Sequence, residues 1–252
     1  MRMFLAGSMG GLTKSKYSQE ELFKGAYILQ SFYYVDKYVE NVIMPNCKDF
    51  ILDSGAFTFM QNSKKSVNWD EYVEKYAEFV KKHKVKKYFE LDIDSIVGLK
   101  EVERLRAKLE ALVGWQCIPV WHLWRGMDYW HKMCKEYSYV AIGGLADTDK
   151  HSKRIKKLHN CFPMLINIAH KNGAKVHGLG YTSLKGIKKY HFDSVDSTSW
   201  LSGNRFGAVY KFNGETIVKI DKPKNKRVKT NIAMENNFME WKKFSQYVER
   251  MY

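Results

Sequence analysis

Residues 50–57 read FILDSGAF, in which a short apolar run ends at Asp53 and passes directly into a Ser-Gly turn. Further along the chain, other short apolar runs end in the same way, at an aspartate, a histidine or a glycine. Such runs, bounded by turn residues, are typical of β-strands. We predict strands at residues 3–6, 50–53, 88–93, 117–122, 139–143, 175–179 and 192–196.

Amphipathic stretches separate these runs and predict helices. In residues 68–80, for example, Tyr72, Tyr76 and Phe79 recur at helical spacing. Strand–helix alternation indicates a parallel α/β sheet, and its regular repeat favours a closed (β/α)8 barrel of the TIM type. Because seven strands are visible, we expect the eighth within residues 34–43, or an irregular segment in its place. No strand leads into a GxGxxG turn, which argues against a dinucleotide-binding Rossmann domain.

The last part of the chain, residues 206–252, follows another pattern. Apolar and polar side chains around Asn213 and Gly214 predict a β-hairpin with a type I′ turn. A basic stretch and a closing amphipathic helix over residues 231–252 come next. Because no long linker precedes this segment, we predict one domain over residues 1–252, with the hairpin, the basic stretch and the helix appended to the barrel.

The composition excludes several classes of protein and indicates a polyanionic partner. With 45% hydrophobic residues the chain can form a large core, and no apolar run approaches the roughly 20 residues of a membrane span. The four cysteines are far apart, so we expect reduced thiols in the cytoplasm and no zinc knuckle. The net charge of +15 favours a nucleic-acid partner, because Lys and Arg displace counterions from phosphates; a solubilising surface is the alternative.

Polar residues and glycines gather at the carboxyl ends of the predicted strands, which in a (β/α)8 barrel all face one mouth. They are Asp53, Asp92, Asp94, His122, Gly143, Gly144, His177, Gly178, Gly180 and Asp196. Each alone has an ordinary structural explanation, such as a turn or a buried histidine. Their recurrence at the same end of nearly every strand indicates an active site. Carboxylates around an aromatic mouth suit glycosyl chemistry, in which one attacks an anomeric carbon and another transfers a proton.

Four segments at these strand ends carry longer motifs. They read LDSGAF at residues 52–57, GGL at 143–145, HGLG at 177–180 and DSVDSTSW at 193–200. In this order they resemble the tRNA-guanine transglycosylase superfamily, in which the corresponding segments read TDSGG(F/Y)Q, GGL, (H/M)GxG and, in the archaeal branch, DLFDSASY. Members of this superfamily exchange guanine for a 7-deazaguanine base. The resemblance is spread over roughly residues 50–200.

The resemblance implies a role for each matching residue. Asp196 becomes the nucleophile and Asp53 the general acid/base, while a shifted register of the last motif would name Asp193 as the nucleophile instead. The implied base-binding residues are Phe57, Asp92, Asp94, His122, Gly143, Gly144, Leu145, His177, Gly178 and Gly180.

Within this set the family pattern assigns contacts to the base. Phe57 stacks on one face of the base, and His177 packs over the base. Asp92 hydrogen-bonds the polar edge of the base, and Asp94 is a nearby alternative for that role. The backbone of residues 143–145 hydrogen-bonds the base. His122 departs from the pattern, since it stands roughly where the family has a glutamine.

Two further departures point to the substrate. The chain lacks the Cys-x-Cys-x-x-Cys…His zinc site and the extra RNA-binding domains of the tRNA enzymes, and so looks like the compact DNA transglycosylases of phages and bacteria. This likeness implies exchange of guanine in DNA for a free base such as 7-cyano-7-deazaguanine, with no metal or other cofactor, in the cytoplasm of a bacterium or of a phage's host. Partner proteins that open the duplex are compatible with it. The residues expected to bind the phosphates of the nucleic-acid backbone are Lys222, Lys224, Lys226, Arg227 and Lys229.

Rival interpretations stay open at this point. The same exchange could act on tRNA, since the motifs do not distinguish the sugars. Water could replace the incoming base, which would make the protein a nucleoside or nucleic-acid N-glycosidase. A barrel that only binds nucleic acid, or a metal-dependent hydrolase built on His122 and His177, would be the remaining alternatives.

Overall fold

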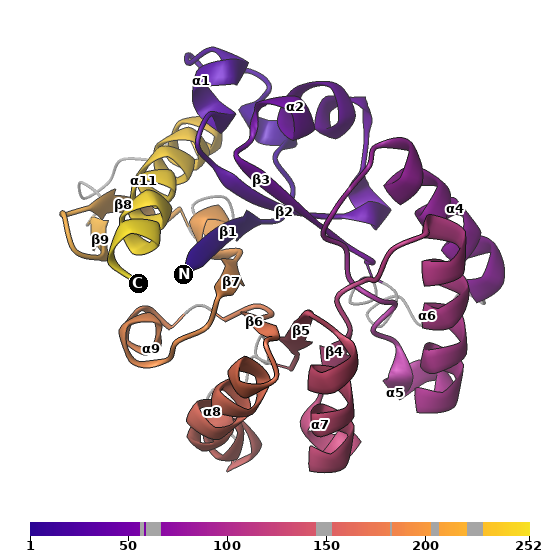
Figure 1. Ribbon diagram of the computed structural model, residues 1–252. Coiled ribbons are helices and arrows are strands. Elements are labelled where there is room, and N and C mark those ends of the chain that lie inside the picture. Colours follow the sequence, from indigo (N-terminus) through magenta and orange to yellow (C-terminus); the bar gives the residue numbers. More distant parts are fainter. Residues whose placement is uncertain (56–57, 59–66, 145–152, 182, 203–206, 221–228) are drawn as a thin grey trace.

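The computed structural model spans residues 1–252 and describes all of them except 56–57, 59–66, 145–152, 182, 203–206 and 221–228; for residues 153–157 it describes the backbone alone. Seven parallel strands form one curled sheet in the order β3-β2-β1-β7-β6-β5-β4, and helices surround it (Figure 1). The strands are β1 (Arg2–Ala6), β2 (Tyr27–Ser31), β3 (Asp49–Asp53), β4 (Val120–Trp121), β5 (Tyr139–Ile142), β6 (Lys175–Gly178) and β7 (Ser194–Ser197).

Two single-residue bridges join the outer edges of this sheet. Leu52 of β3 pairs with Tyr88, and Phe89 pairs with Ile118, which lies just before β4. The Phe89 amide donates to the Leu52 carbonyl at 3.0 Å, and the Glu90 amide donates to the Ile118 carbonyl at 3.1 Å. Residues 88–89 therefore occupy the strand position between β3 and β4, and the ring of parallel segments follows chain order. The predicted α/β class is confirmed, as a TIM-type barrel with one irregular member.

The missing strand lies elsewhere than expected. Residues 34–43 are largely helical, in η2 (Phe32–Tyr34) and η3 (Val39–Ile43), whereas the strand overlooked in the sequence is β2. Its first four residues, YILQ, are all buried, so the alternation that identifies a half-buried strand is absent. The strand predicted over residues 88–93 is reduced to the two bridges.

Helices occupy the connections between strands. They are α1 (Gln19–Phe23), α2 (Met44–Asn46), α4 (Trp69–Lys82), α5 (Asp94–Val97), α6 (Leu99–Val113), α7 (Gly126–Glu136), α8 (Lys153–Lys171), α9 (Leu184–Lys189) and α11 (Thr230–Met251), with short 3-10 turns η1 (Gly10–Leu12), η4 (Leu123–Arg125) and η5 (Ser199–Leu201). In α4 the Asn68 side chain caps the first turn, and Val73, Tyr76 and Val80 are buried. None of the described helices is long and apolar enough to cross a membrane.

Side chains alternate between the barrel interior and the layer under the helices. In β1, Phe4 lies in the interior cluster, while Met3 and Leu5 belong to the outer cluster. The same period-two alternation in β7 sends Val195 outward. Its neighbour Asp196 therefore points into the barrel, at the carboxyl end of the strand.

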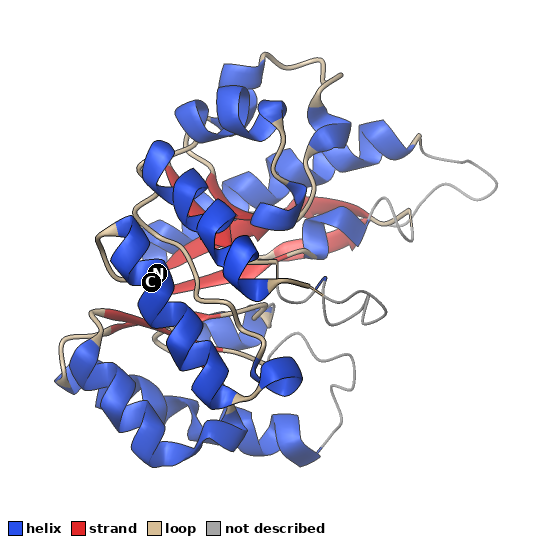
Figure 2. Cartoon of the chain, turned by 90° about the vertical axis from the view of Figure 1, so that its right-hand side faces the viewer, coloured by secondary structure: helices blue, strands red, loops and turns tan. Residues whose placement is uncertain are grey.

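The carboxyl-terminal segment forms a hairpin and a long helix; the helix packs beside β1 and the hairpin packs on the helix. The two ends of the chain therefore lie close together (Figure 2). Strands β8 (Val209–Phe212) and β9 (Ile217–Ile220) are antiparallel, as predicted. The connection between them has four residues, so the predicted type I′ turn is wrong. The Asn213 side chain accepts the amides of Glu215 and Thr216 and thereby holds this longer loop. On α11, Ser245 donates to the Met3 carbonyl at 2.7 Å.

Candidate active site

Asp196 is held at the carboxyl end of β7 in a fixed orientation. Its side chain is almost fully buried, and its Oδ1 accepts the Gly180 amide at 2.5 Å and lies 3.1 Å from His177 Nε2. Gly180 follows β6 with a φ of +73°, a conformation that few residues other than glycine adopt and that turns its amide toward Asp196. One carboxylate oxygen is thus anchored from two directions, which orients the other.

His177 lies inside the barrel beneath Asp196. The imidazole is fully buried, with Phe89 at a ring distance of 5.2 Å, and its Nδ1 lies 2.5 Å from Ser194 Oγ. Ser194 in turn hydrogen-bonds the hydroxyl of Tyr139. This chain of polar groups supports the Asp196 carboxylate from below, so the structure places His177 next to the predicted nucleophile.

Asp53 ends β3, and its Oδ2 accepts the Gly55 amide at 3.1 Å. Burial raises the pKa of the Asp53 carboxyl to about 7; the Gly55 hydrogen bond opposes this rise, and the negative charges of Asp196 and Asp92 add to it. Asp196 and Asp92 therefore lie close enough to Asp53 to influence its carboxyl group. A carboxyl with a pKa near neutrality can both donate and accept a proton under physiological conditions.

Asp92 lies between an imidazole and a guanidinium. Its Oδ1 is 2.6 Å from His122 Nε2 and 3.6 Å from Arg125 Nη2. His122 is buried directly after β4 and stacks on Trp124, with ring centroids 4.2 Å apart and planes 5° from parallel. The indole nitrogen of Trp124 donates to Asp94 at 2.8 Å.

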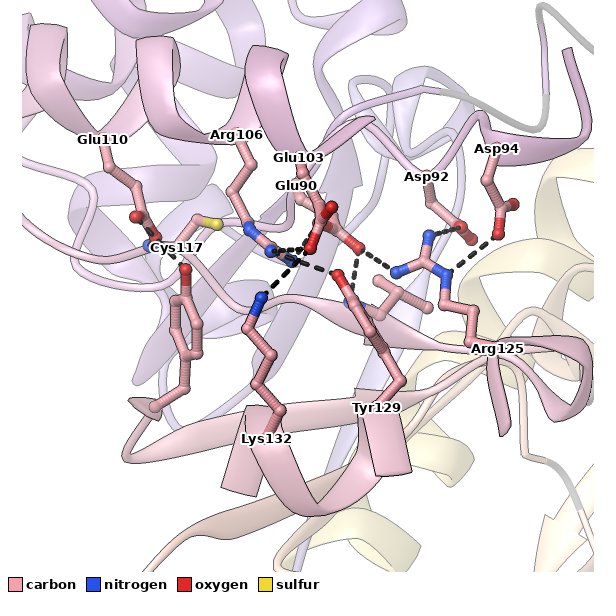
Figure 3. A network of polar contacts seen from close by, with 12 residues as sticks. Glu90, Asp92, Asp94, Glu103, Arg106, Glu110, Cys117, Arg125, Tyr129 and Lys132 are labelled. Atoms are coloured by element: carbon pink, nitrogen blue, oxygen red, sulfur yellow. Dashed lines mark hydrogen bonds and ion pairs between the residues drawn. The ribbon is translucent and has the colours of Figure 1, made fainter. Parts of the chain in front are cut away.

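Arg125 connects this cluster to the buried charges behind it (Figure 3). Its side chain is fully buried; Nε donates to Asp94 at 2.9 Å and Nη1 donates to Glu90 at 2.8 Å. Burial would raise the pKa of Asp94, but the Arg125 charge and its hydrogen bond outweigh burial and lower it. Glu90 also pairs with Arg106, through its second oxygen at 2.9 Å. One guanidinium therefore fixes both Asp92 and Asp94 relative to the barrel.

Gly143 and Gly144, which follow β5, lack side chains that would collide with or crowd the His122 ring. A Cβ at Gly143 would lie 2.5 Å from His122 Cε1 and 2.7 Å from Val120 Cγ1, so only glycine fits beside this ring. Among the described residues, His122 Nδ1 has no hydrogen-bond partner although it is buried. Gly144 lies on the same side, since its Cβ would be 3.5 Å from that nitrogen. Gly178, by contrast, is tightly surrounded by Tyr181, Phe192 and Val195.

In the described part of the chain, Asp92, Asp94 and His122 are close enough to hold a metal ion, with one ligand atom from each lying within 4.8 Å of the others. Arg125 already bonds Asp94 and approaches Asp92. A divalent cation would lie next to this fixed positive charge, which opposes its binding. His177, the second histidine of the metal-hydrolase alternative, contacts Asp196 instead.

The remaining site predictions fall into three groups. Asp193 lies at the amino end of β7, where its carboxylate pairs with His170 and accepts the Val176 amide, so the shifted register would put the nucleophile at the wrong end of the barrel. Lys229 is exposed just before α11. The residues that lie outside the described part of the chain are Phe57, Leu145, Lys222, Lys224, Lys226 and Arg227.

Arg125, Glu90 and Arg106 were not among the site residues predicted from the sequence. The available signal was an arginine that follows the apolar run VWHLW and an acidic FELDID segment. Their pairing depends on the three-dimensional neighbours of β4, which no local pattern encodes.

Matched substitutions can separate the positioning role of Arg125 from its structural role. Arg125→Lys and Arg106→Lys each keep the charge next to Glu90 but lose the fork geometry of the guanidinium. We expect both to lower the melting temperature. Of the two, only Arg125→Lys should raise the KM for the free base that the sequence resemblance predicts as substrate, by about tenfold or more, because of the two arginines only Arg125 touches Asp92 and Asp94. An equal KM in both variants would contradict this role.

Comparisons with known proteins leave the family open. No family model matches the chain, and no curated protein does. Among solved structures, the chain is similar to the carboxyl transferase domain of Rhizobium etli pyruvate carboxylase, determined with pyruvate, with a TM-score of 0.46 and 12% identity. The match covers 98% of this chain and 48% of that one, so this chain spans about half the length of that structure.

Proposed function

We propose that the protein is a transglycosylase that exchanges guanine in DNA for a free 7-deazaguanine base through a covalent aspartyl–sugar intermediate. The observation that carries the proposal is the pair of unlike carboxyl groups at the mouth: a buried, oriented Asp196 and an Asp53 whose pKa is raised to about 7. Double displacement at an anomeric carbon requires this division between a nucleophile and a proton-transferring group.

In the first half-reaction, a carboxylate oxygen of Asp196 attacks C1′ of the target nucleotide. The C1′–N9 bond breaks, and its electron pair remains on the departing guanine, which takes the proton of Asp53. The hydrogen bonds of Gly180 and His177 to Oδ1 hold the attacking group in place. The target base must be unstacked for this attack, because C1′ and the base edge are not accessible within a duplex.

In the second half-reaction, the incoming base loses its N9 proton to the Asp53 carboxylate. Its N9 attacks C1′, and the ester bond to Asp196 breaks, which regenerates both carboxyl groups. Asp92, fixed by Arg125, accepts hydrogen bonds from the edge of the base, and the buried Nδ1 of His122 faces the same side as Gly143 and Gly144. None of these steps requires a metal or a redox cofactor, and a cytoplasmic location fits the proposal.

The first test offers a labelled free base with two acceptors. The purified protein is incubated with labelled guanine or 7-cyano-7-deazaguanine and either DNA or unmodified tRNA. Label in DNA supports the proposal, and label in tRNA alone would keep the chemistry but overturn the substrate. Release of free guanine without incorporation would favour the N-glycosidase alternative.

A further inference from the structure

The connection between α4 and the bridges at residues 88–89 carries a cluster of lysines. Residues 81–87, here called the basal loop, read KKHKVKK, and the side chains of Lys82, Lys84 and Lys86 are exposed. Because the basal loop leads into a strand position, it lies at the amino end of the barrel, opposite the mouth.

Arg2 and Lys48 extend this positive charge across the amino end of the barrel. Arg2 begins β1 and Lys48 directly precedes β3. Arg2 and Lys87 both reach the carboxylate of Asp49, and Lys48 pairs with Glu249 at 2.6 Å. The basal loop is therefore continuous with the amino ends of two central strands.

A hollow of about 470 Å³ continues the same surface at the amino ends of β6 and β7. The basic and titratable side chains that line it include Arg2, His170, Lys175 and His191. Lys175 is the first residue of β6 and is exposed. The basal loop, Arg2, Lys48 and Lys175 are together called the basal face.

Four carboxylates on or beside the basal face are paired with cations of the same surface. The pairs are Asp49 with Arg2 and Lys87, Glu249 with Lys48, Glu40 with Lys82, and Asp193 with His170. Lys84, Lys86 and Lys175 are exposed and take part in no ion pair within the described part of the chain. The basal face therefore keeps a net positive charge after its own ion pairs are formed.

The electrostatics of the helix end account for only part of this charge. Lys81 and Lys82 lie in the last turn of α4, where unpaired carbonyl groups favour cations. Lys84 and Lys86 follow the helix and lie beyond its last turn. A reason other than the helix is therefore needed for these two lysines.

Lys84 occupies a position at which glycine is favoured. Its amide donates to the Lys81 carbonyl at 3.2 Å, and the Val85 amide donates to the Val80 carbonyl at 2.9 Å, which is the Schellman arrangement. This arrangement needs a left-handed residue, and Lys84, with a φ of +52°, is the one non-glycine residue with a positive φ in the described part of the chain. Helix α6, by contrast, ends on the left-handed Gly114. Lysine at this strained position keeps an exposed charge that glycine would remove.

We propose that the basal face binds the phosphate backbone of a nucleic acid, separately from the mouth. The identity of this partner rests on the proposed function, which names a polynucleotide as the substrate. Lysine and arginine side chains gain affinity for such a backbone by releasing its counterions, and no base has to be read. The carboxylates of the mouth repel phosphates, whereas the basal face attracts them and holds a long substrate close to the enzyme.

A polynucleotide fits the basal face better than a free phosphate does. The cations lie on several elements, namely the basal loop and the amino ends of β1, β3 and β6. A single phosphate meets only one or two of them, whereas a backbone repeats its charge at regular spacing and engages the whole surface.

The test compares two variants that each lose two positive charges. Lys84→Gly/Lys86→Gln changes the basal face, and Lys211→Gln/Lys219→Gln changes two exposed lysines of the β8–β9 hairpin. The ligand is a labelled dA·dT duplex, which contains no guanine and so cannot be a substrate. Fluorescence anisotropy gives its affinity at several salt concentrations, and phosphatidylglycerol vesicles are the second ligand. Glycine relieves the strained backbone at position 84, so the basal variant should not melt at a lower temperature.

We expect the basal variant to bind the duplex about tenfold more weakly at low salt. The slope of log affinity against log salt should fall by about 2, because two phosphate contacts are lost. The hairpin variant should bind like the wild type. Equal losses in the two variants, no duplex binding by the wild type, or basal-face binding of vesicles alone would overturn the inference.

The same proteins separate this inference from the proposed function. Duplex binding that depends on the basal face, without base exchange on any acceptor, would keep the inference and reject the transglycosylase. Base exchange with duplex binding that is equal in the wild type and the basal variant would keep the transglycosylase and reject the inference.

Discussion

Asp196→Asn is expected to lower the rate of base exchange by about 10³-fold or more, because an amide oxygen cannot form the ester to C1′. The fold should persist, since asparagine can still accept the Gly180 amide through its side-chain oxygen. Without an incoming base, the wild type should accumulate a protein–DNA adduct that survives denaturation, and the variant should not. The adduct is measured by its shifted mobility on a denaturing gel.

The control for this experiment lies on the same strand. Asp193→Asn changes a carboxylate at the amino end of β7, far from the mouth, where it pairs with His170. We expect a modest loss of stability and a normal yield of adduct. If Asp193→Asn abolished the adduct and Asp196→Asn formed it, the assignment of the nucleophile would be reversed.

Asp53→Asn should lower both half-reactions, by about 10²- to 10⁴-fold, the usual contribution of a general acid/base. The pH dependence has opposite signs in the two halves, because burial raises the pKa of Asp53 to about 7. Guanine release needs the protonated carboxyl, so it should slow as the pH rises through about 7. Attack by the incoming base needs the carboxylate, so it should slow as the pH falls through the same range. Single-turnover rates of guanine release and of attack by the incoming base, measured as a function of pH, test the two dependences.

The pH dependence of protein stability is an independent measure of the raised pKa of Asp53. The folded protein holds the Asp53 proton more tightly than the unfolded chain, whose carboxyl titrates near 3.8. Stability is therefore lost as the pH rises from about 4 to about 7, and the loss persists above that range. Asp53→Asn removes this penalty and should raise the melting temperature at pH 8 but not at pH 4. An equal shift at both pH values would argue against a raised pKa.

The sequence was most informative where chemistry follows directly from strand topology. Parallel strands bring their carboxyl ends to one mouth, so Asp53, Asp92 and Asp196 could be grouped before any coordinates were known. The position of Asp196 relative to Asp193 followed from the motif, and the period-two alternation of β7 gives the physical reason. The roles of these residues in base exchange stay predictions.

Other features could not be obtained from the sequence. Strand β2 is buried along its first four residues and too short to distinguish from a helical turn by periodicity. The role of Arg125 depends on its contacts with Glu90, Asp92 and Asp94, which are 30 or more residues away in the sequence. The sequence also did not reveal that His177 is fully buried inside the barrel, with Ser194 and Asp196 at its two ring nitrogens; its packing over the base stays a prediction.

The pairing of β1 with β7 has a consequence for how the chain acquires its structure. Strand β1 is paired on its second edge only when β7, residues 194–197, is in place. It is covered by α11 only when Ser245 hydrogen-bonds the Met3 carbonyl. Contacts over such separations are slow to form, because the entropy of closing the loop is lost before the contact is gained. During synthesis, this edge of β1 therefore stays unpaired until residues 194–197 have been made, and β1 stays uncovered until Ser245 has been made. Completion of the barrel, and with it the placement of Asp196, therefore belongs to the last stage of folding.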